Sequence, residues 1–295
     1  MNKPIKPQLC KLMDTPFDNP DWSWEMKYDG IRLVAEVIAP NYQIWSRSGR
    51  EITMQFPELK FNTSMPAILD GELVCYDARG ISDFQAIQHR TTRQNHIKWA
   101  IEHYPVFYEV FDVLEIGGTG MIGLPLIDRR KLLAGLVTET ENVRVAKTYA
   151  LGTTLFTEAE TKGYEGVVGK LNTSKYKCGD RADWVKVKVG ITEDFLICGF
   201  TQGTGWRAGT FGALVLGKIA PDGTTTYVGE VGTGFEAKMI ATLMEEMAKQ
   251  PKTNCPFVKE PDQAVWIQPN LKAKVHFAEY TNEAKLRFPS FKGLA

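Results

Sequence analysis

A lysine close to an aspartate and a glycine is the arrangement in this sequence best suited to covalent chemistry. Lys27 and Asp29 flank a predicted turn in the segment Glu25-Met-Lys-Tyr-Asp-Gly-Ile-Arg32, and Gly30 permits the bend between two strands. Partial burial and neighbouring cations lower the pKa of a lysine, so we expect Lys27 to be a nucleophilic amine near neutral pH. A charged hairpin tip without a catalytic role explains the same residues, and this segment alone leaves both interpretations open.

Further charged and aromatic clusters follow Lys27, each beside a predicted strand. Lys186 and Lys188 are separated by one residue within such a strand, so their side chains lie on the same face and can point into one cleft. A solvated strand face is the alternative for that pair. The clusters are Ser46-Arg47-Ser48-Gly49-Arg50-Glu51, Asp70-Gly71-Glu72-Leu73, Phe107-Tyr108-Glu109-Val110-Phe111-Asp112-Val113-Leu114, Glu165-Gly166-Val167-Val168-Gly169-Lys170 and Trp184-Val185-Lys186-Val187-Lys188.

In this order and at these separations, the motifs resemble those of the covalent nucleotidyltransferase superfamily. In detail the sequence resembles an ATP-dependent DNA ligase of the small two-domain bacterial or phage type, and it is similar to the ligase domain of bacterial end-joining ligases. The resemblance implies that the chain seals 5′-phosphate/3′-hydroxyl nicks in duplex DNA through a covalent lysyl-AMP and then an AMP–DNA intermediate. An RNA ligase or mRNA guanylyltransferase of the same superfamily is one alternative, and a catalytically impaired DNA-binding OB module is the other.

The resemblance also implies a role for each motif residue. Lys27 would attack ATP, while Lys186 and Lys188 would lower its pKa and later grip the AMP phosphate. Glu165 would bind the metal, Mg²⁺ or Mn²⁺, and Glu72 would hydrogen-bond the ribose or serve as a second metal ligand. The other expected nucleotide contacts are Glu25 at the adenine edge, Phe111 stacked on the adenine, Arg32 and Arg47 at ribose and phosphate groups, and Arg181 at the phosphates.

Apolar alternation predicts mainly strands up to about residue 190. Helical spacing at Ser82–Arg90, Asp128–Leu136 and Thr154–Lys162 adds a few helices, so we expect an α+β fold in which helices flank antiparallel sheets. The predicted strands are Trp24–Lys27, Ile31–Ile38, Tyr42–Trp45, Ala67–Tyr76, Val106–Leu114, Gly166–Lys170 and Trp184–Val189.

A different pattern begins after residue 190. Short strands, glycine-rich connections and one amphipathic helix, Glu236–Gln250, predict an OB-fold barrel of about five strands. We therefore expect an adenylation domain over residues 1–190 and a DNA-binding OB domain over residues 191–295. The loop Thr204-Gly205-Trp206-Arg207-Ala208-Gly209 can lie against a sugar–phosphate backbone, with barrel packing as the alternative role for Trp206.

Composition limits the classes of partner. Lysine and arginine number 35, as do aspartate and glutamate, so a local patch must hold the expected nicked double-stranded DNA. The five cysteines are scattered, which argues against a zinc ribbon or a disulfide framework. No segment resembles a signal peptide or a membrane span. We expect a cytoplasmic monomer without a membrane partner that uses ATP and nicked DNA.

Overall fold

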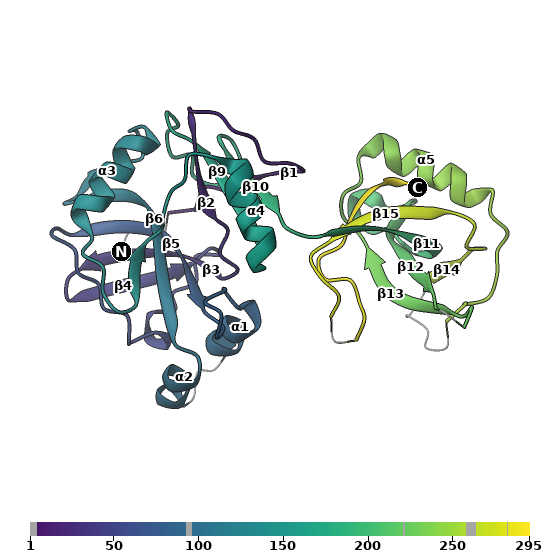
Figure 1. The fold of residues 1–295 in the computed structure, drawn as a ribbon, viewed down its shortest axis with the longest axis horizontal. Helices are drawn as coiled ribbons and strands as arrows, with labels where there is room; N and C mark the ends of the chain where they lie inside the picture. Colours follow the sequence, from purple (N-terminus) through teal and green to yellow (C-terminus); the bar gives the residue numbers. More distant parts are fainter. Residues whose placement is uncertain (1–4, 93–95, 221, 258–263, 282) are drawn as a thin grey trace. The chain divides into compact units, whose positions relative to one another are not determined.

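The computed structural model describes residues 5–92, 96–220, 222–257, 264–281 and 283–295. The chain folds into two compact units, Met1–Val189 and Gly190–Ala295, each with its own core. Figure 1 shows mixed sheets and helices in the first unit and a barrel with one helix in the second. The α+β class predicted from the sequence is therefore confirmed.

One sheet of the first unit has four strands. Its order is β1 (Lys11–Met13), β10 (Trp184–Lys188), β9 (Gly166–Leu171) and β2 (Trp22–Met26), with β1 parallel to β10 and the other pairs antiparallel. The helix α4 (Gly152–Lys162) covers its outer face, where Leu155 and Ala159 pack against Trp24, Val167 and Val187. Alternate residues of these strands point to the opposite, inner face.

The second sheet of this unit is built around two long strands, β5 (Ala67–Cys75) and β6 (Val106–Ile116). Its outer face packs on the core that includes Ile87 of α1 (Phe84–Thr92) and Leu133 of α3 (Leu126–Leu136). The order is β4 (Asn41–Ser46), β3 (Ile31–Ile38), β5, β6 and β7 (Thr119–Gly120), with β8 (Val143–Val145) parallel to β6. A short helix α2 (Ile97–His103) and the 3₁₀ turn η1 (Thr53–Gln55) lie in the connections.

A third apolar cluster joins the inner faces of the two sheets. Val34 of β3 and Phe111 of β6 belong to it together with Trp184 of β10, whose ring meets that of Phe111 edge-on at 6.1 Å between centroids. Strand alternation puts Arg32, Glu72, Lys186 and Lys188 on these same inner faces, and we call the region where the two inner faces meet the cleft.

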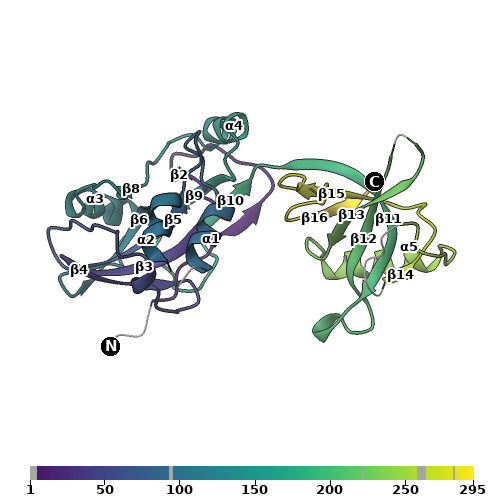
Figure 2. The ribbon, with the colours of Figure 1, turned by 90° about the horizontal axis from the view of Figure 1, so that it is seen from below.

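The second unit is a barrel built on β11 (Ile191–Gln202). The sheet order is β13 (Thr225–Val231), β12 (Phe211–Ile219), β11, β15 (Lys272–Phe277) and β16 (Ser290–Leu294), and β14 (Ala264–Trp266) also pairs with β11. Two backbone bonds close it, from Leu286 N to Val228 O (2.8 Å) and from Phe291 N to Thr233 O (2.9 Å). The helix α5 (Ala237–Ala248) packs its apolar side on the barrel core. Figure 2 shows this helix lying against the strands of the barrel.

The elements absent from the sequence predictions are short or lack a strong pattern. Strands β1 and β8 have three residues each, β7 has two, and α2 spans two turns. Strand β16 follows Pro289 and contains Gly293, residues typical of loops. Within the described residues, no helix is long and apolar enough to cross a membrane.

Candidate active site

Lys27 lies at the end of β2, where the chain passes from one sheet to the other. Its backbone N–H donates to the carbonyl of Gly166 (2.9 Å), which fixes it beside the start of β9. Its ammonium Nζ donates to Glu165 Oε2 (2.5 Å), and Lys188 Nζ lies 2.9 Å from the other oxygen, Oε1. One carboxylate therefore holds two lysines in the cleft.

Gly166 is what allows Glu165 to approach β10 so closely. Its φ is +147°, and a Cβ at this position would lie 2.1 Å from the carbonyl oxygen of Val187. The Glu165 carbonyl accepts a bond from Val189 N (3.0 Å), so β10 holds this residue by its backbone as well. Glycine is therefore required here for backbone packing, and the carboxylate is positioned as a consequence.

Strand β10 sorts its residues between the two faces with a period of two. Val185 and Val187 lie in the outer core under α4, whereas Trp184 packs in the cluster between the sheets. Lys186 and Lys188 share the face of Trp184 and point into the cleft. Both lysines thus lie on the side where Lys27 meets Glu165.

The charges around Lys27 act in the direction opposite to the one the sequence suggested. Burial alone would lower the pKa of Lys27, but the carboxylates of Glu165 and Glu72 outweigh burial, and the net pKa is raised. The expected lowered pKa is therefore wrong in this structure. It is Lys186 whose pKa is lowered, by burial and by the charges of Lys27 and Lys188.

The carboxylates of the cleft respond in opposite directions. Burial disfavours the ionised form of Glu165, yet Lys27 and Lys188 hold its pKa below the usual value. Burial raises the pKa of Glu72 to about 7, against the opposing charges of Lys27 and Arg32. With a pKa near 7, Glu72 is partly protonated at neutral pH.

Arg32 is tied to a buried carboxylate that the sequence analysis left without a role. Its Nε and Nη2 donate to the two oxygens of Asp70 at 2.6 and 2.7 Å, and the Tyr176 hydroxyl donates to Asp70 Oδ2 (2.6 Å). The guanidinium carbon lies 4.4 Å from the centre of the Phe111 ring. Arg32 thus forms part of the wall of the cleft.

The predicted adenine-binding end is already occupied by an ion pair. Glu25 Oε2 accepts a bond from Lys170 Nζ (2.7 Å), and that ammonium lies 4.0 Å from the centre of the Phe111 ring. Phe111 is only 6% exposed, so cations cover the ring expected to stack on adenine. Glu25 Oε1 is buried without a hydrogen-bond partner, and Arg130 Nη1 lies 3.5 Å from it.

Two predicted site residues lie outside this group of contacts. Arg47 is exposed in the turn after β4, although its backbone N donates to the carbonyl of Arg32 (3.1 Å). Arg181 is exposed in the loop before β10, and its backbone N donates to Asp180 Oδ1 (2.5 Å). Neither side chain contacts the Lys27–Glu165 pair in the described contacts.

Residues missed by the sequence analysis differ in whether a signal was available. Asp70 and Lys170 lie inside recognised motifs, an even number of residues from Glu72 and Val168, so strand alternation could have placed both on the inner faces. Arg130 on α3 and Tyr176 in a loop carry no local pattern, because only the tertiary fold brings them to the cleft.

The oxygen donors beside Lys27 fit a magnesium-type ion. Glu165 and Glu72 are both close enough to act on the charge of Lys27. Mg²⁺ is commonly held by one or two carboxylates together with substrate phosphates and water, so a larger protein cage is not needed. No group of three or more His, Cys, Asp or Glu side chains suited to a metal occurs in the part of the chain that the structure describes.

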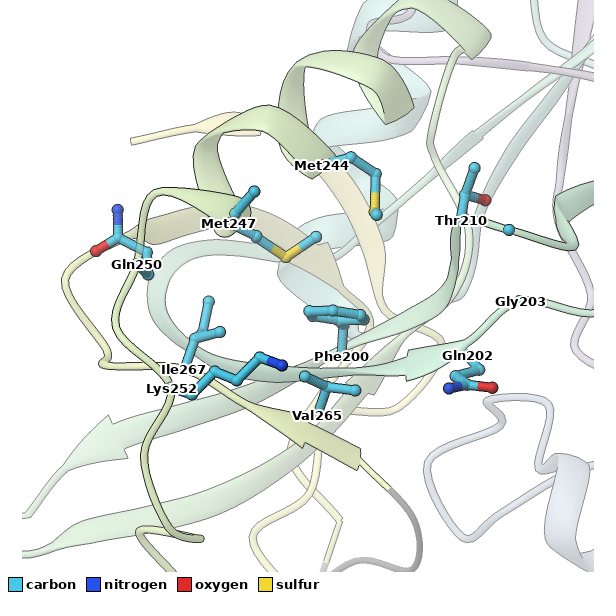
Figure 3. Close-up of a pocket in the computed structure, with 12 residues that line it drawn as sticks. Phe200, Gln202, Gly203, Thr210, Met244, Met247, Gln250, Lys252, Val265 and Ile267 are labelled. Carbon is cyan, nitrogen blue, oxygen red and sulfur yellow. The ribbon is translucent and has the colours of Figure 1, made fainter.

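The pocket drawn in Figure 3 belongs to the barrel unit and is distinct from this cleft. It has a volume of about 550 Å³, and Phe200 and the α5 residues Met244 and Met247 form much of its apolar wall. Gln202, Thr210, Gln250 and Lys252 give it a partly polar rim. None of the cleft residues described above lines it.

Together, the fold and the site define a nucleotidyltransferase domain followed by an OB-fold domain. The sequence profile described as "ATP dependent DNA ligase domain" matches residues 5–188, and the profile "ATP dependent DNA ligase C terminal region" matches residues 207–295. The chain therefore belongs to the ATP-dependent DNA ligase family.

Individual relatives agree with the family. The chain is 32% identical over 283 residues to "Multifunctional non-homologous end joining DNA repair protein LigD" of Mycobacterium tuberculosis, an alignment that covers 92% of this chain and 36% of that protein. It is 33% identical over 279 residues to a DNA ligase of Pyrobaculum neutrophilum, covering 87% of this chain and 48% of the other. The chain thus spans about a third to a half of the length of these curated relatives.

Solved structures give the same picture. The crystal structure of the ligase domain of M. tuberculosis LigD matches with a TM-score of 0.57 and 30% identity, over 99% of this chain and 95% of that one. A Lig E DNA ligase structure matches with a TM-score of 0.65 over 98% of both chains, and its 18% identity supports the fold alone.

Proposed function

We propose that the chain seals 5′-phosphate/3′-hydroxyl nicks in duplex DNA with Lys27 as the nucleophile. Lys27 Nζ bonds to the α-phosphorus of ATP while pyrophosphate leaves, the AMP then passes to the DNA 5′-phosphate, and the 3′-hydroxyl finally displaces it. The observation that carries this proposal is the position of the Lys27 ammonium at 2.5 Å from Glu165, with Lys188 on the other carboxylate oxygen. This places an amine among cations and a carboxylate, as a phosphoryl transfer requires.

Before it can attack, Lys27 has to lose both a proton and its partner. In this structure Glu165 stabilises the charged form of Lys27, so the Lys27–Glu165 ion pair must break when the nucleotide enters. Lys186 and Lys188 would then bind the α-phosphate from the same strand face. Arg181, in the loop before β10, would contact the other phosphates. Arg32 and Arg47, adjacent through a backbone bond, would contact ribose and phosphate groups.

Glu165 and Glu72 would hold the divalent cation, Mg²⁺ or Mn²⁺. The cation would supply positive charge for the phosphate oxygens and lower the pKa of the neighbouring lysine. Glu72 would also be within reach of the ribose from its strand.

Adenine recognition would centre on Glu25. Its buried Oε1 accepts no hydrogen bond within the described residues, and an adenine 6-amino group would supply the missing donor. Guanine presents an acceptor at that position and would leave Oε1 unpaired. Phe111 would stack on the ring only after Lys170 moves away from its face.

The proposed partner is nicked double-stranded DNA, and the proposed working form is a monomer. We also propose that the chain acts in end-joining DNA repair, the role named for the LigD relative.

Intact-protein mass spectrometry tests the proposal. Incubation with Mg²⁺ and ATP should add one AMP, GTP should add nothing, and nicked duplex should remove the adduct. Lys27→Ala should form no adduct, whereas Lys60→Ala, which alters an exposed lysine paired with Glu141, should behave as the wild type. A GMP adduct, or an AMP adduct on Lys27→Ala, would contradict the assignment.

A further inference from the structure

Between β11 and β12 the barrel unit carries a loop, residues 203–210, that presents Trp206 to solvent. The side chain is 79% exposed, which makes it the most exposed aromatic residue in the described part of the chain. Exposing an indole of this size forgoes considerable burial, so a position with a purely structural role would favour a smaller or polar residue. The exposure of Trp206 therefore indicates that this loop has a function, and the chemistry of the cleft does not involve it.

Backbone hydrogen bonds hold this loop in one conformation. Gly203 N donates to Thr210 O (3.0 Å), Arg207 N to Thr204 O (3.1 Å), and Thr210 N to Arg207 O (2.9 Å). Gly205 and Gly209 have φ of +59° and +86°, and an added Cβ at either would meet nothing within 4 Å. These two glycines allow the positive φ values of the turn, and the space beside each of them is open to a partner.

Arg207 anchors the indole to the barrel. Its Nη1 donates to the carbonyls of Gly212 (2.9 Å) and Gly232 (3.1 Å), and its guanidinium carbon lies 4.9 Å from the Trp206 ring and 5.5 Å from the Phe235 ring. Phe235 in turn stacks on Phe291 at 4.8 Å. The indole is thus backed by a fixed cation that is rooted in the barrel core.

An apolar cavity lies beside the loop, yet Trp206 does not fill it. Gly203, Gly209 and Thr210, near the two ends of the loop, line the pocket of about 550 Å³ with Met244 and Met247, and Figure 3 shows this arrangement. Trp206 is absent from the pocket lining. A tryptophan kept for barrel packing would have used that space, so the geometry argues against the packing alternative.

We propose that Trp206 is a DNA-contacting residue that lays its indole against the deoxyribose rings and base edges along a groove of the nicked duplex. In a paired duplex the base faces are stacked, and the groove walls are the apolar surface that a projecting ring can reach. Arg207 directly behind the ring brings positive charge toward the phosphates. This inference rests on the proposed DNA ligase function and adds the residue and the kind of contact.

Fluorescence anisotropy with labelled nicked duplex at fixed salt tests the inference. Burying an aromatic ring against an apolar surface is typically worth about 5- to 100-fold in affinity, so Trp206→Ala should raise Kd by that factor and Trp206→Phe by less. The slope of log Kd against log salt should stay unchanged, because the removed contact is not ionic. Met54→Ala, which removes a comparably exposed apolar side chain (81%), should leave Kd unchanged.

Two further measurements keep the outcomes separate. Self-adenylylation by Trp206→Ala should match the wild type, since it needs no DNA, and nicked duplex should protect the wild-type protein from acrylamide quenching more than it protects Trp206→Phe. An unchanged Kd in Trp206→Ala, or equal protection of both proteins, would overturn the proposed contact. Failure of the wild type itself to bind nicked duplex would overturn the proposed function instead.

Discussion

Replacing Asp70 with asparagine tests whether the cleft wall depends on a buried charge pair. Asp70 is fully buried and accepts two bonds from Arg32, at 2.6 and 2.7 Å, and one from Tyr176 at 2.6 Å. Asparagine keeps the shape but removes the negative charge, so the Arg32 guanidinium stays buried against the Phe111 ring without the carboxylate that pairs with it directly.

The expected loss in the free energy of unfolding follows from the removal of one member of a buried ion pair. Such losses cost about 3–5 kcal/mol, because the remaining charge stays out of water without compensation. Tyr176→Phe removes only one hydrogen bond to a charged acceptor and should cost about 1.5–3 kcal/mol. The matched control is Glu141→Gln, which neutralises a carboxylate at an equal 2.7 Å from Lys60 where both side chains are about two-thirds exposed, and it should cost less than about 1 kcal/mol.

Native-state hydrogen exchange is the suitable assay, because two compact units need not unfold together. The free energy of opening should fall for amides of β3 and β5 in Asp70→Asn, while barrel amides stay unchanged. Equal effects of Asp70→Asn and Glu141→Gln would contradict this expectation, since burial would then not distinguish the two ion pairs.

Three further outcomes follow from the same cleft. Burial raises the pKa of Glu72 from its ordinary 4.5 to about 7, so between these pH values the folded state keeps a proton that the unfolded state releases. The free energy of unfolding should therefore fall as pH rises through that window. Hydrogen exchange at pH 4.5–8 should show that Glu72→Gln removes up to about 3 kcal/mol of this pH dependence. Gly166→Ala forces a Cβ against Val187 and should cost at least about 2 kcal/mol and abolish the AMP adduct, whereas Gly135→Ala, in open space within α3, should be neutral or stabilising by thermal unfolding. Glu25→Gln should lower the ATP-to-GTP preference in adduct formation about tenfold or more, and an unchanged preference would remove Glu25 from adenine recognition.

How much of the site could be predicted depended on whether the evidence was local. Alternation along β10 predicted that Lys186 and Lys188 share one face, and the resemblance assigned Arg32 and Glu72 to the same site. In the structure, Arg32 and Glu72 are paired across β3 and β5. The motif order supplied the family, which the comparisons confirm.

What could not be predicted was the balance of charges and contacts between distant segments. Glu165 is 138 residues from Lys27 in the chain, and no local pattern reveals that its carboxylate would outweigh burial and raise the lysine's pKa. In the same way, Phe111 was assigned by motif position, while its cover of Lys170 and Arg32 arises only when β9 and β3 meet β6.

The proposed binding of ATP requires a local excess of positive charge in a chain without net charge. Asp70 neutralises Arg32, so Arg32 forms part of the wall of the cleft but adds little to its positive electrostatic potential. Lys27 and Lys188 pair with Glu165, whose pKa they lower, and Lys186 lies on the same strand face as Lys188. Glu72, with a pKa of about 7, is only partly charged at neutral pH, so positive charge exceeds negative charge among these residues. Because Glu165 keeps Lys27 protonated, the proposed entry of ATP has to break that ion pair before the first covalent step.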